Sequence, residues 1–333
     1  MNLDTTYLGL ALPHPFIAGA SPLTNDLDNV RRLEDAGAAA IVMNSLFEEQ
    51  IVHEQMSAYL AGELASEGDG AALAGGPVAV PFGGRPQEYL EHLRQVRQAV
   101  ALPIIGSLNG STPGGWLEYA RLIEEAGADA LELNVYALAT DPWRGAAEIE
   151  EETVELLRAV RGAVQIPLAV KLSPFYTSLA HFAERLVDAG ADGLVFFNPF
   201  YQPDIDIESQ SIDRSLHLTL ASDLALRLRW LAILSGQIRT SFAVSGGVHA
   251  ASDAIKAVMT GADAVQLVSE LLAQGPERLR TIREEVAYWL VDHQYESIAQ
   301  LRGSMNLRTC PDPAAYERAN YMLILRSWHR PPG

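Results

Sequence analysis

Short apolar segments of this chain repeatedly end in a residue that can donate or accept a hydrogen bond. Eight such segments alternate with helical patterns, and the polar residue stands at the carboxyl end of each. Any single Asn or Ser in this place could simply cap the next helix or turn. Eight of them together favour a ring of polar groups around one ligand site. These residues are Ser21, Asn44, Ser45, Ser107, Asn109, Asn134, Lys171, Ser173, Asn198, Ser245 and Ser269.

Lys171 is the residue of this set with the most specific chemistry. It stands inside the apolar segment LAVKL (168–172), and the only other lysine of the chain is Lys256. A buried ammonium group is costly unless it meets an anion or an electron-rich group. The alternative is a lysine at a strand end that extends its charge into solvent.

The sequence Ser245-Gly246-Gly247 follows an apolar segment and precedes a helix that is expected from about residue 250. Backbone N–H groups of glycines beside a helix N-terminus bind phosphate without a cationic side chain. Together with Val268 and Ser269 they would lie on the loops after strands seven and eight, the usual phosphate site of a β/α barrel. We therefore expect a phosphate-bearing cofactor or substrate.

The elements that would position these residues show an internal repeat. In each copy a helical pattern ends, a glycine suited to a left-handed conformation follows, and a short apolar segment begins. Such segments are typical of strands buried on both faces of a parallel sheet. The copies are AGAAAIVMN (36–44), AGADALELN (126–134), AGADGLVFFN (189–198) and GADAVQLVS (261–269).

Four further apolar segments, at 15–21, 103–110, 167–174 and 241–247, bring the number of expected strands to eight. Alternating strands and helices of this size predict an α/β fold, a single (β/α)8 TIM barrel. The strands are expected near 15–20, 39–44, 103–108, 130–135, 167–172, 193–198, 241–245 and 264–268, and helices include 25–36, 113–126, 177–189 and 250–260.

Three connections, 46–84, 137–151 and 199–220, are long insertions after strand ends, where barrel enzymes build their sites. The Gly- and Ala-rich run 68–76 is predicted to be a mobile loop or lid. We expect a barrel over residues 1–304 and a C-terminal extension over 305–333. The aromatic stretch 316–328 predicts packing against the barrel or against a second copy in a homodimer.

Composition excludes several classes of function. The net charge of −18 argues against a nucleic-acid partner or an anionic membrane surface. One cysteine, Cys310, excludes an intramolecular disulfide and fits a reducing compartment, and no secretory signal or membrane span is evident. A cytoplasmic location is expected. The eight histidines show no metal-ligand spacing, so no metal site is predicted.

Residues 3–304 resemble the dihydroorotate dehydrogenases, in particular their soluble class. The resemblance rests on PFIAGAS (15–21), ELN (132–134), AVKLSP (169–174), the asparagine of FFNP (196–199) and the long segment 245–276. It implies a flavoprotein barrel that binds FMN and oxidises dihydroorotate to orotate in pyrimidine biosynthesis.

The resemblance also implies roles for single residues. Lys171 would contact the isoalloxazine or ribityl part of FMN and take part in catalysis. The other residues expected to bind the cofactor are Ala20, Ser21, Ser45, Asn134, Ser245, Gly246, Gly247 and Ser269, and those expected to bind substrate are Asn44, Asn109, Asn134 and Asn198.

Three departures indicate a divergent, dihydroorotate dehydrogenase-like branch. Where the family has Thr-Lys-Ser after strand two, this chain has MNS (43–45), and Ala137 occupies the position of the Cys or Ser base. The family's substrate loop has no counterpart between residues 50 and 86. Tyr136 and Tyr201 are candidate substitutes for proton transfer, with aromatic packing as the alternative for both.

Three functions remain open at this point. The first is an FMN-dependent oxidoreductase acting on a small, pyrimidine-like ring. The second is a non-catalytic or regulatory flavin-binding barrel, which the missing base would explain. The third is a flavin-free lyase or isomerase that uses Lys171 on a phosphorylated small molecule.

Overall fold

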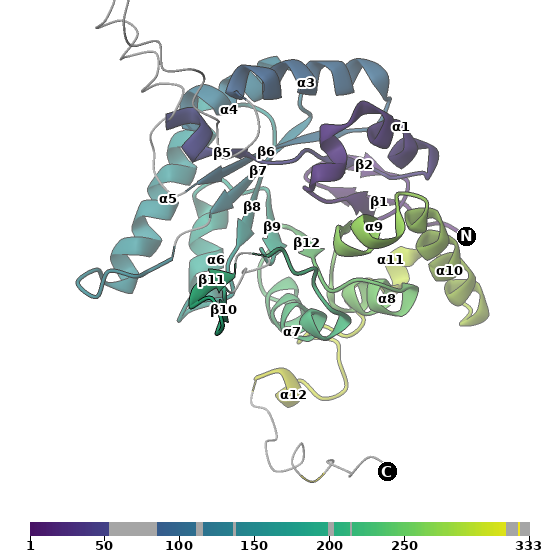
Figure 1. Cartoon of the computed structure of the whole chain (residues 1–333). Coiled ribbons are helices and arrows are strands. Elements are labelled where there is room, and N and C mark those ends of the chain that lie inside the picture. The colour runs from purple at the N-terminus through teal and green to yellow at the C-terminus, as the bar shows by residue number, and fades with distance from the viewer. Residues whose placement is uncertain are drawn as a thin grey trace, which may run out of the picture.

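Eight parallel strands close into a barrel surrounded by helices in the computed structural model of the protein (Figure 1). The structure describes residues 1–52, 85–110, 116–135, 138–198, 203–213, 215–317 and 326. Pairing of β13 with β3 and of β4 with β6 completes the ring, so the predicted (β/α)8 barrel is confirmed. In ring order the strands are β3 (Phe16–Ala18), β4 (Ile41–Val42), β6 (Ile104–Gly110), β7 (Ala130–Val135), β8 (Leu168–Leu172), β9 (Gly193–Phe196), β12 (Ser241–Ser245) and β13 (Ala264–Leu267), and β5 (Leu46–Phe47) pairs with the end of β6.

The helices bury one apolar face each against the outside of the barrel. In α6, Leu179, Phe182 and Leu186 are fully buried and recur at helical spacing. The described α-helices are α1 (Leu27–Asp35), α3 (Pro86–Ala99), α4 (Trp116–Glu125), α5 (Ala146–Ala163), α6 (Leu179–Asp188), α7 (Leu224–Ser235), α8 (Ala251–Thr260), α9 (Ser269–Gln274), α10 (Arg278–Asp292), α11 (Ile298–Leu301) and α12 (Ala314–Glu317).

An N-terminal hairpin, β1 (Thr5–Tyr7) and β2 (Leu10–Leu12), packs against the inner apolar cluster of the barrel. Tyr7 is fully buried there with inward residues of the strands, among them Ile17 and Val195. Both residues of its two-residue turn have positive φ, as the turns that match strand twist require. Strands of three residues are too short to show periodicity, so the sequence did not indicate this hairpin.

The repeated Gly-Ala-Asp segments have a structural explanation. Their glycines have positive φ and end the preceding helices, and each aspartate then binds the start of a neighbouring strand. The carboxylate of Asp129 accepts from the N–H of Ile104 at 2.8 Å, and that of Asp192 accepts from Leu168 at 2.9 Å. Asp263 accepts from Phe242 at 2.8 Å. These carboxylates satisfy backbone donors at the amino ends of β6, β8 and β12.

All three long connections are partly described. The connection after β9 contains an exposed hairpin, β10 (Asp204–Asp206) and β11 (Ser211–Asp213), and returns over 215–220 to the start of α7. The predicted lid, 68–76, lies outside the described residues. After residue 304 the chain bonds back to the barrel helices, because the N–H of Leu307 donates to the carbonyl of Ala232, and α12 lies near α7 (Figure 1).

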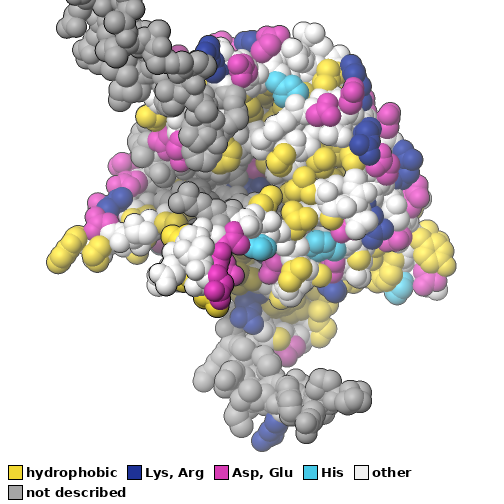
Figure 2. Space-filling view, in the orientation of Figure 1, with side chains coloured by type: hydrophobic (Ala, Val, Ile, Leu, Met, Phe, Trp, Pro, Cys, Tyr) yellow, Lys and Arg dark blue, Asp and Glu magenta, His cyan; other side chains and the backbone are white. Residues whose placement is uncertain are grey.

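Surface charge on the face shown in Figure 2 is mixed. Over its described part, Lys and Arg side chains stand singly among acidic side chains and form no continuous basic patch. Within the described ranges, none of the helices has both the length and the apolar character to cross a membrane.

We expect Asp129→Ala to destabilise the protein by about 1–3 kcal/mol, because the buried N–H of Ile104 loses its acceptor. The midpoint of thermal unfolding, followed by circular dichroism, measures the change. Glu125→Ala, which removes an exposed carboxylate at the end of α4, is the control and should have little effect. Equal midpoints for the two variants would show that the aspartate does not hold the strand.

Candidate functional site

A cavity of about 80 Å³ lies at the carboxyl ends of β3, β8, β12 and β13, with the segment 216–219 as one wall. Pockets for cofactor-sized ligands usually measure about 300–1,000 Å³. The space that these residues enclose is therefore smaller than a cofactor-sized ligand needs. The predicted cofactor-binding residues that line the cavity are Ala20, Ser21, Lys171, Ser245, Gly246 and Ser269.

Lys171 is buried and pairs with an acid inside the barrel. Its Nζ lies 3.3 Å from Oε1 of Glu132 and 3.3 Å from Oε1 of Gln266, and Nε2 of Gln266 donates to Oε2 of Glu132 at 2.5 Å. Lys171 is 4% exposed and Glu132 is 1% exposed, so the alternative of a charge extended into solvent does not hold. Sequence reasoning missed Glu132 and Gln266. Each is a polar residue inside an apolar strand, the same signal that marked Lys171.

Asn134 and Ser45 meet in a second polar group. The side-chain amide of Asn134 donates to Oγ of Ser107 at 2.7 Å and to Oγ of Ser45 at 3.1 Å, and the two hydroxyls are 2.8 Å apart. These hydrogen bonds join the segment after β4 to the neighbouring strands β6 and β7 at the barrel mouth. The cluster brings together two residues predicted to bind the cofactor.

The remaining predicted substrate residues are dispersed. The side chain of Asn44 donates to Asn25 at 3.0 Å, which ties it to the loop after β3, and Asn109 is half-buried at the end of β6. Asn198 is 9% exposed, and its buried Nδ2 has no hydrogen-bond partner. Most buried donors in native proteins are paired, so this one is available to a ligand acceptor. Tyr136 and Tyr201 lie outside the described residues.

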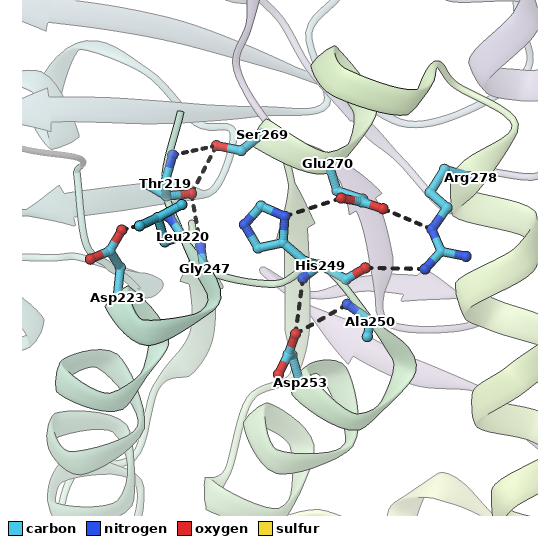
Figure 3. Close-up of polar contacts among 10 residues, drawn as sticks. All are labelled: Thr219, Leu220, Asp223, Gly247, His249, Ala250, Asp253, Ser269, Glu270 and Arg278. Carbon is cyan, nitrogen blue, oxygen red and sulfur yellow. Dashed lines mark hydrogen bonds and ion pairs between the residues drawn. The ribbon is translucent and has the colours of Figure 1, made fainter. Parts of the chain in front are cut away.

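The glycine loop after β12 is closed by Thr219. Gly246 and Gly247 have φ of 84° and 79°, and the N–H of Gly247 donates to Oγ1 of Thr219 at 3.0 Å. Thr219 also donates its own N–H to Oγ of Ser269 at 3.1 Å, and the two hydroxyls are 2.8 Å apart (Figure 3). The threonine hydroxyl thus occupies the donors expected to bind phosphate. No local sequence signal indicated Thr219.

The two backbone amides that precede α8 are already bonded to a side chain of that helix. Oδ2 of Asp253 accepts from the N–H groups of His249 and Ala250, both at 3.1 Å (Figure 3). The predicted phosphate site rests on the glycine N–H groups, and that prediction does not depend on these two amides. The donors at the mouth are those of the glycine loop and of the hydroxyls around it.

Arg227 supports the glycine loop from α7 and was also missed. Its Nε donates to the carbonyl of Ser245 at 2.5 Å and its Nη1 to that of Asp223 at 2.6 Å. The side chain is buried, and burial lowers the pKa of its guanidinium, which nevertheless stays charged. A Cβ on Gly246 would come within 3.0 Å of its Nη2. The sequence could have indicated Arg227, because it is a charged residue within the apolar segment that forms α7.

Chemically, the mouth combines neutral hydrogen-bond donors with buried cations. The glycine loop and the hydroxyls of Thr219 and Ser269 can hold an oxyanion, and Arg227 adds positive potential behind them. Within the described ranges, no group of three or more His, Cys, Asp or Glu residues could hold a metal ion.

Comparison with known proteins supports one family. A family model described as dihydroorotate dehydrogenase matches residues 85–290. The chain is 26% identical, over 91% of its length and 97% of the relative's, to a candidate dihydroorotate dehydrogenase A (fumarate) of Aeropyrum pernix. It is 29% identical to the catalytic subunit of dihydroorotate dehydrogenase B (NAD(+)) of Citrifermentans bemidjiense, over 66% of this chain and 73% of that one. It is 22% identical to the dihydropyrimidine dehydrogenase subunit PreA of Escherichia coli, over 93% and 78%.

We expect Lys171→Met to destabilise the protein by about 3–5 kcal/mol, because it leaves the carboxylate of Glu132 buried without a cation. The double variant Lys171→Met/Glu132→Gln should recover most of this loss. Thermal unfolding midpoints measure both effects.

Lys256→Met is the control, since that lysine is 57% exposed and its ion pair with Asp253 contributes little. If Lys171→Met behaves like the control, or if the double variant is no more stable than the single one, the buried pair does not have this role.

Proposed function

The chain belongs to the dihydroorotate dehydrogenase family, and from this premise we propose that it is an FMN-dependent oxidoreductase acting on a small ring compound. Membership of this family makes the chain a dihydroorotate dehydrogenase-like oxidoreductase. The proposal concerns the cofactor, the residues that hold it and the substrate class. The observation that carries it is the convergence of six predicted cofactor residues on one cavity beside the glycine loop.

The residues at the mouth fit a phosphate-bearing flavin. A Cβ on Gly247 would come within 2.6 Å of the backbone nitrogen of Leu224, so the close approach of backbone at this loop needs glycine. The amide of Gly247 and the hydroxyl of Ser269 would hold the phosphate once Thr219 has moved aside. Lys171, which also lines the cavity, would face the ring system. Bound FMN would supply the acceptor for two electrons, chemistry that no side chain of the chain provides.

The state of Lys171 bears on the choice between functions. Nζ of Lys171 donates to Glu132 and to Gln266 inside the barrel, and an ammonium group held in this way can donate hydrogen bonds but can neither attack a carbonyl nor accept a proton. This argues against the flavin-free lyase or isomerase. It favours Lys171 as a fixed positive charge and donor toward an electron-rich ring.

Among the residues that the structure describes, the asparagines of the proposed substrate side offer donors and acceptors but no base. Asn198 follows β9 and has an unpaired buried amide, and Asn134 lies on β7, two strands away, with its side-chain oxygen left to accept, so a ring with carbonyl and N–H groups could be oriented between them. Ala137 stands at the family's base position and cannot accept a proton. The proposed substrate is therefore a pyrimidine-like ring whose turnover does not depend on a Cys or Ser base.

Purified protein is expected to be coloured by oxidised flavin, with FMN released on denaturation. Gly246→Val should lose most of this flavin, because φ of 84° disfavours a β-branched residue and the side chain would collide with Thr219 and Arg227. The visible absorbance spectrum and chromatography of the extracted cofactor measure retention.

Gly162→Val is the matched control, since a Cβ there has nothing within 4 Å. Circular dichroism verifies that both variants are folded. A colourless wild-type protein that takes up no added FMN contradicts the proposal, and full flavin content in folded Gly246→Val would show that the phosphate binds elsewhere.

Dihydroorotate is expected to be a poor substrate. Loss of a general base costs about a hundredfold to ten-thousandfold in rate, so turnover should stay well below roughly 1 per second. Oxidation of dihydroorotate with fumarate, NAD or a dye as acceptor measures it. Ordinary turnover that disappears in Tyr136→Phe would instead identify Tyr136 as a substitute base.

A further inference from the structure

A polar chain of three residues lies beside the glycine loop and is not used by the proposed function (Figure 3). Nδ1 of His249 lies 3.0 Å from Oε2 of Glu270, whose other oxygen accepts from Nε of Arg278 at 2.8 Å. Arg278 also donates to the backbone carbonyl of His249 at 3.2 Å. The imidazole is thereby held in one orientation, with its Nδ1 proton directed to the carboxylate.

The other ring nitrogen has no partner. Nε2 of His249 is buried, although a quarter of the side chain is exposed, and it makes no hydrogen bond. In Figure 3 this nitrogen points toward Thr219 and Gly247, on the side away from Glu270. A buried polar atom without a partner is rare and needs an explanation. Because Nε2 points toward the glycine loop, a hydrogen-bond partner for it would lie in the space around that loop.

The groups already facing that space would leave a phosphate only partly neutralised. A phosphate monoester carries a charge of about −1.5 to −2 at neutral pH, whereas the amide of Gly247 and the hydroxyls of Thr219 and Ser269 are neutral donors. Arg227 lies behind the loop with Nε and Nη1 engaged by backbone carbonyls. An imidazole that donates from Nδ1 to the carboxylate of Glu270 can also donate from Nε2 when it carries two protons, and Nε2 is then a charged donor toward an anion in this space.

We propose that His249, positioned by Glu270 and Arg278, is the charged ligand of the cofactor phosphate and makes the site select FMN over riboflavin. The inference rests on the proposed function and extends it to the specificity of the phosphate site. When the phosphate displaces the hydroxyl of Thr219 from Gly247, Nε2 of His249 donates to one of its oxygens. Glu270 does not contact the ligand and acts as a positioning residue.

The test compares the dissociation constants of FMN and riboflavin for flavin-free protein by fluorescence titration. A charge-assisted hydrogen bond of this kind corresponds to a roughly tenfold to hundredfold change in affinity. His249→Ala should weaken FMN by that factor and leave riboflavin unchanged. Glu270→Gln should reduce the preference for FMN in the same direction and by less, and His181→Ala, on the exposed side of α6, should change neither.

The outcomes separate the inference from the proposed function. Equal weakening of both flavins in His249→Ala, or an undiminished preference for FMN, contradicts the inference while the flavin assignment stands. Wild-type protein that binds neither flavin contradicts the proposed function, and the inference fails with it.

Discussion

A lysine ammonium group inside a ring of apolar strands sets the strongest constraint on this structure. Lys171 on β8 is neutralised by Glu132 on the adjacent strand β7, and Gln266 reaches both from β13 across the interior. β13 and β8 are separated by β9 and β12 in the sheet, so these three side chains meet only if the sheet curves round and closes. The same contact that satisfies the charge therefore depends on the barrel, and it fixes a cation beneath the mouth where a ligand would bind.

The two ends of the barrel differ in role: contacts at the amino ends of the strands support the fold, and polar groups at the carboxyl ends are available for binding. At the amino ends of the strands, aspartates bind backbone N–H groups and the β1–β2 hairpin closes the interior. At the carboxyl ends, buried polar atoms remain without partners, namely Nδ2 of Asn198 and Nε2 of His249. Barrel enzymes use the same division, because loops at the carboxyl end can vary while the opposite end keeps the strands in register.

Thr219 closes the glycine loop through hydrogen bonds that a phosphate could replace under the proposed function. The threonine hydroxyl takes the amide of Gly247 and bonds Ser269, so three polar groups are satisfied at once. A phosphate oxygen offers the same acceptor with greater charge, and charge-assisted hydrogen bonds are about twice as strong. Exchange of one acceptor for the other would couple ligand entry to movement of the segment 216–219, which borders the cavity.

The sequence by itself determined the barrel, the ring of strand ends and the glycine loop, because these depend on local patterns. Apolar periodicity reports burial, and Gly37, Gly127, Gly190 and Gly261 mark helix ends where positive φ is required. Lys171 was evident for the same reason, as a charge inside an apolar strand. Its partners were decided only by the tertiary structure, since Glu132 and Gln266 stand 39 and 95 residues away. The same holds for Thr219, which is 50 residues from Ser269, and for His249, whose unpaired nitrogen appears only when Glu270 fixes its ring. Closing the ring brings such side chains together, and no spacing along the chain records which of them will meet.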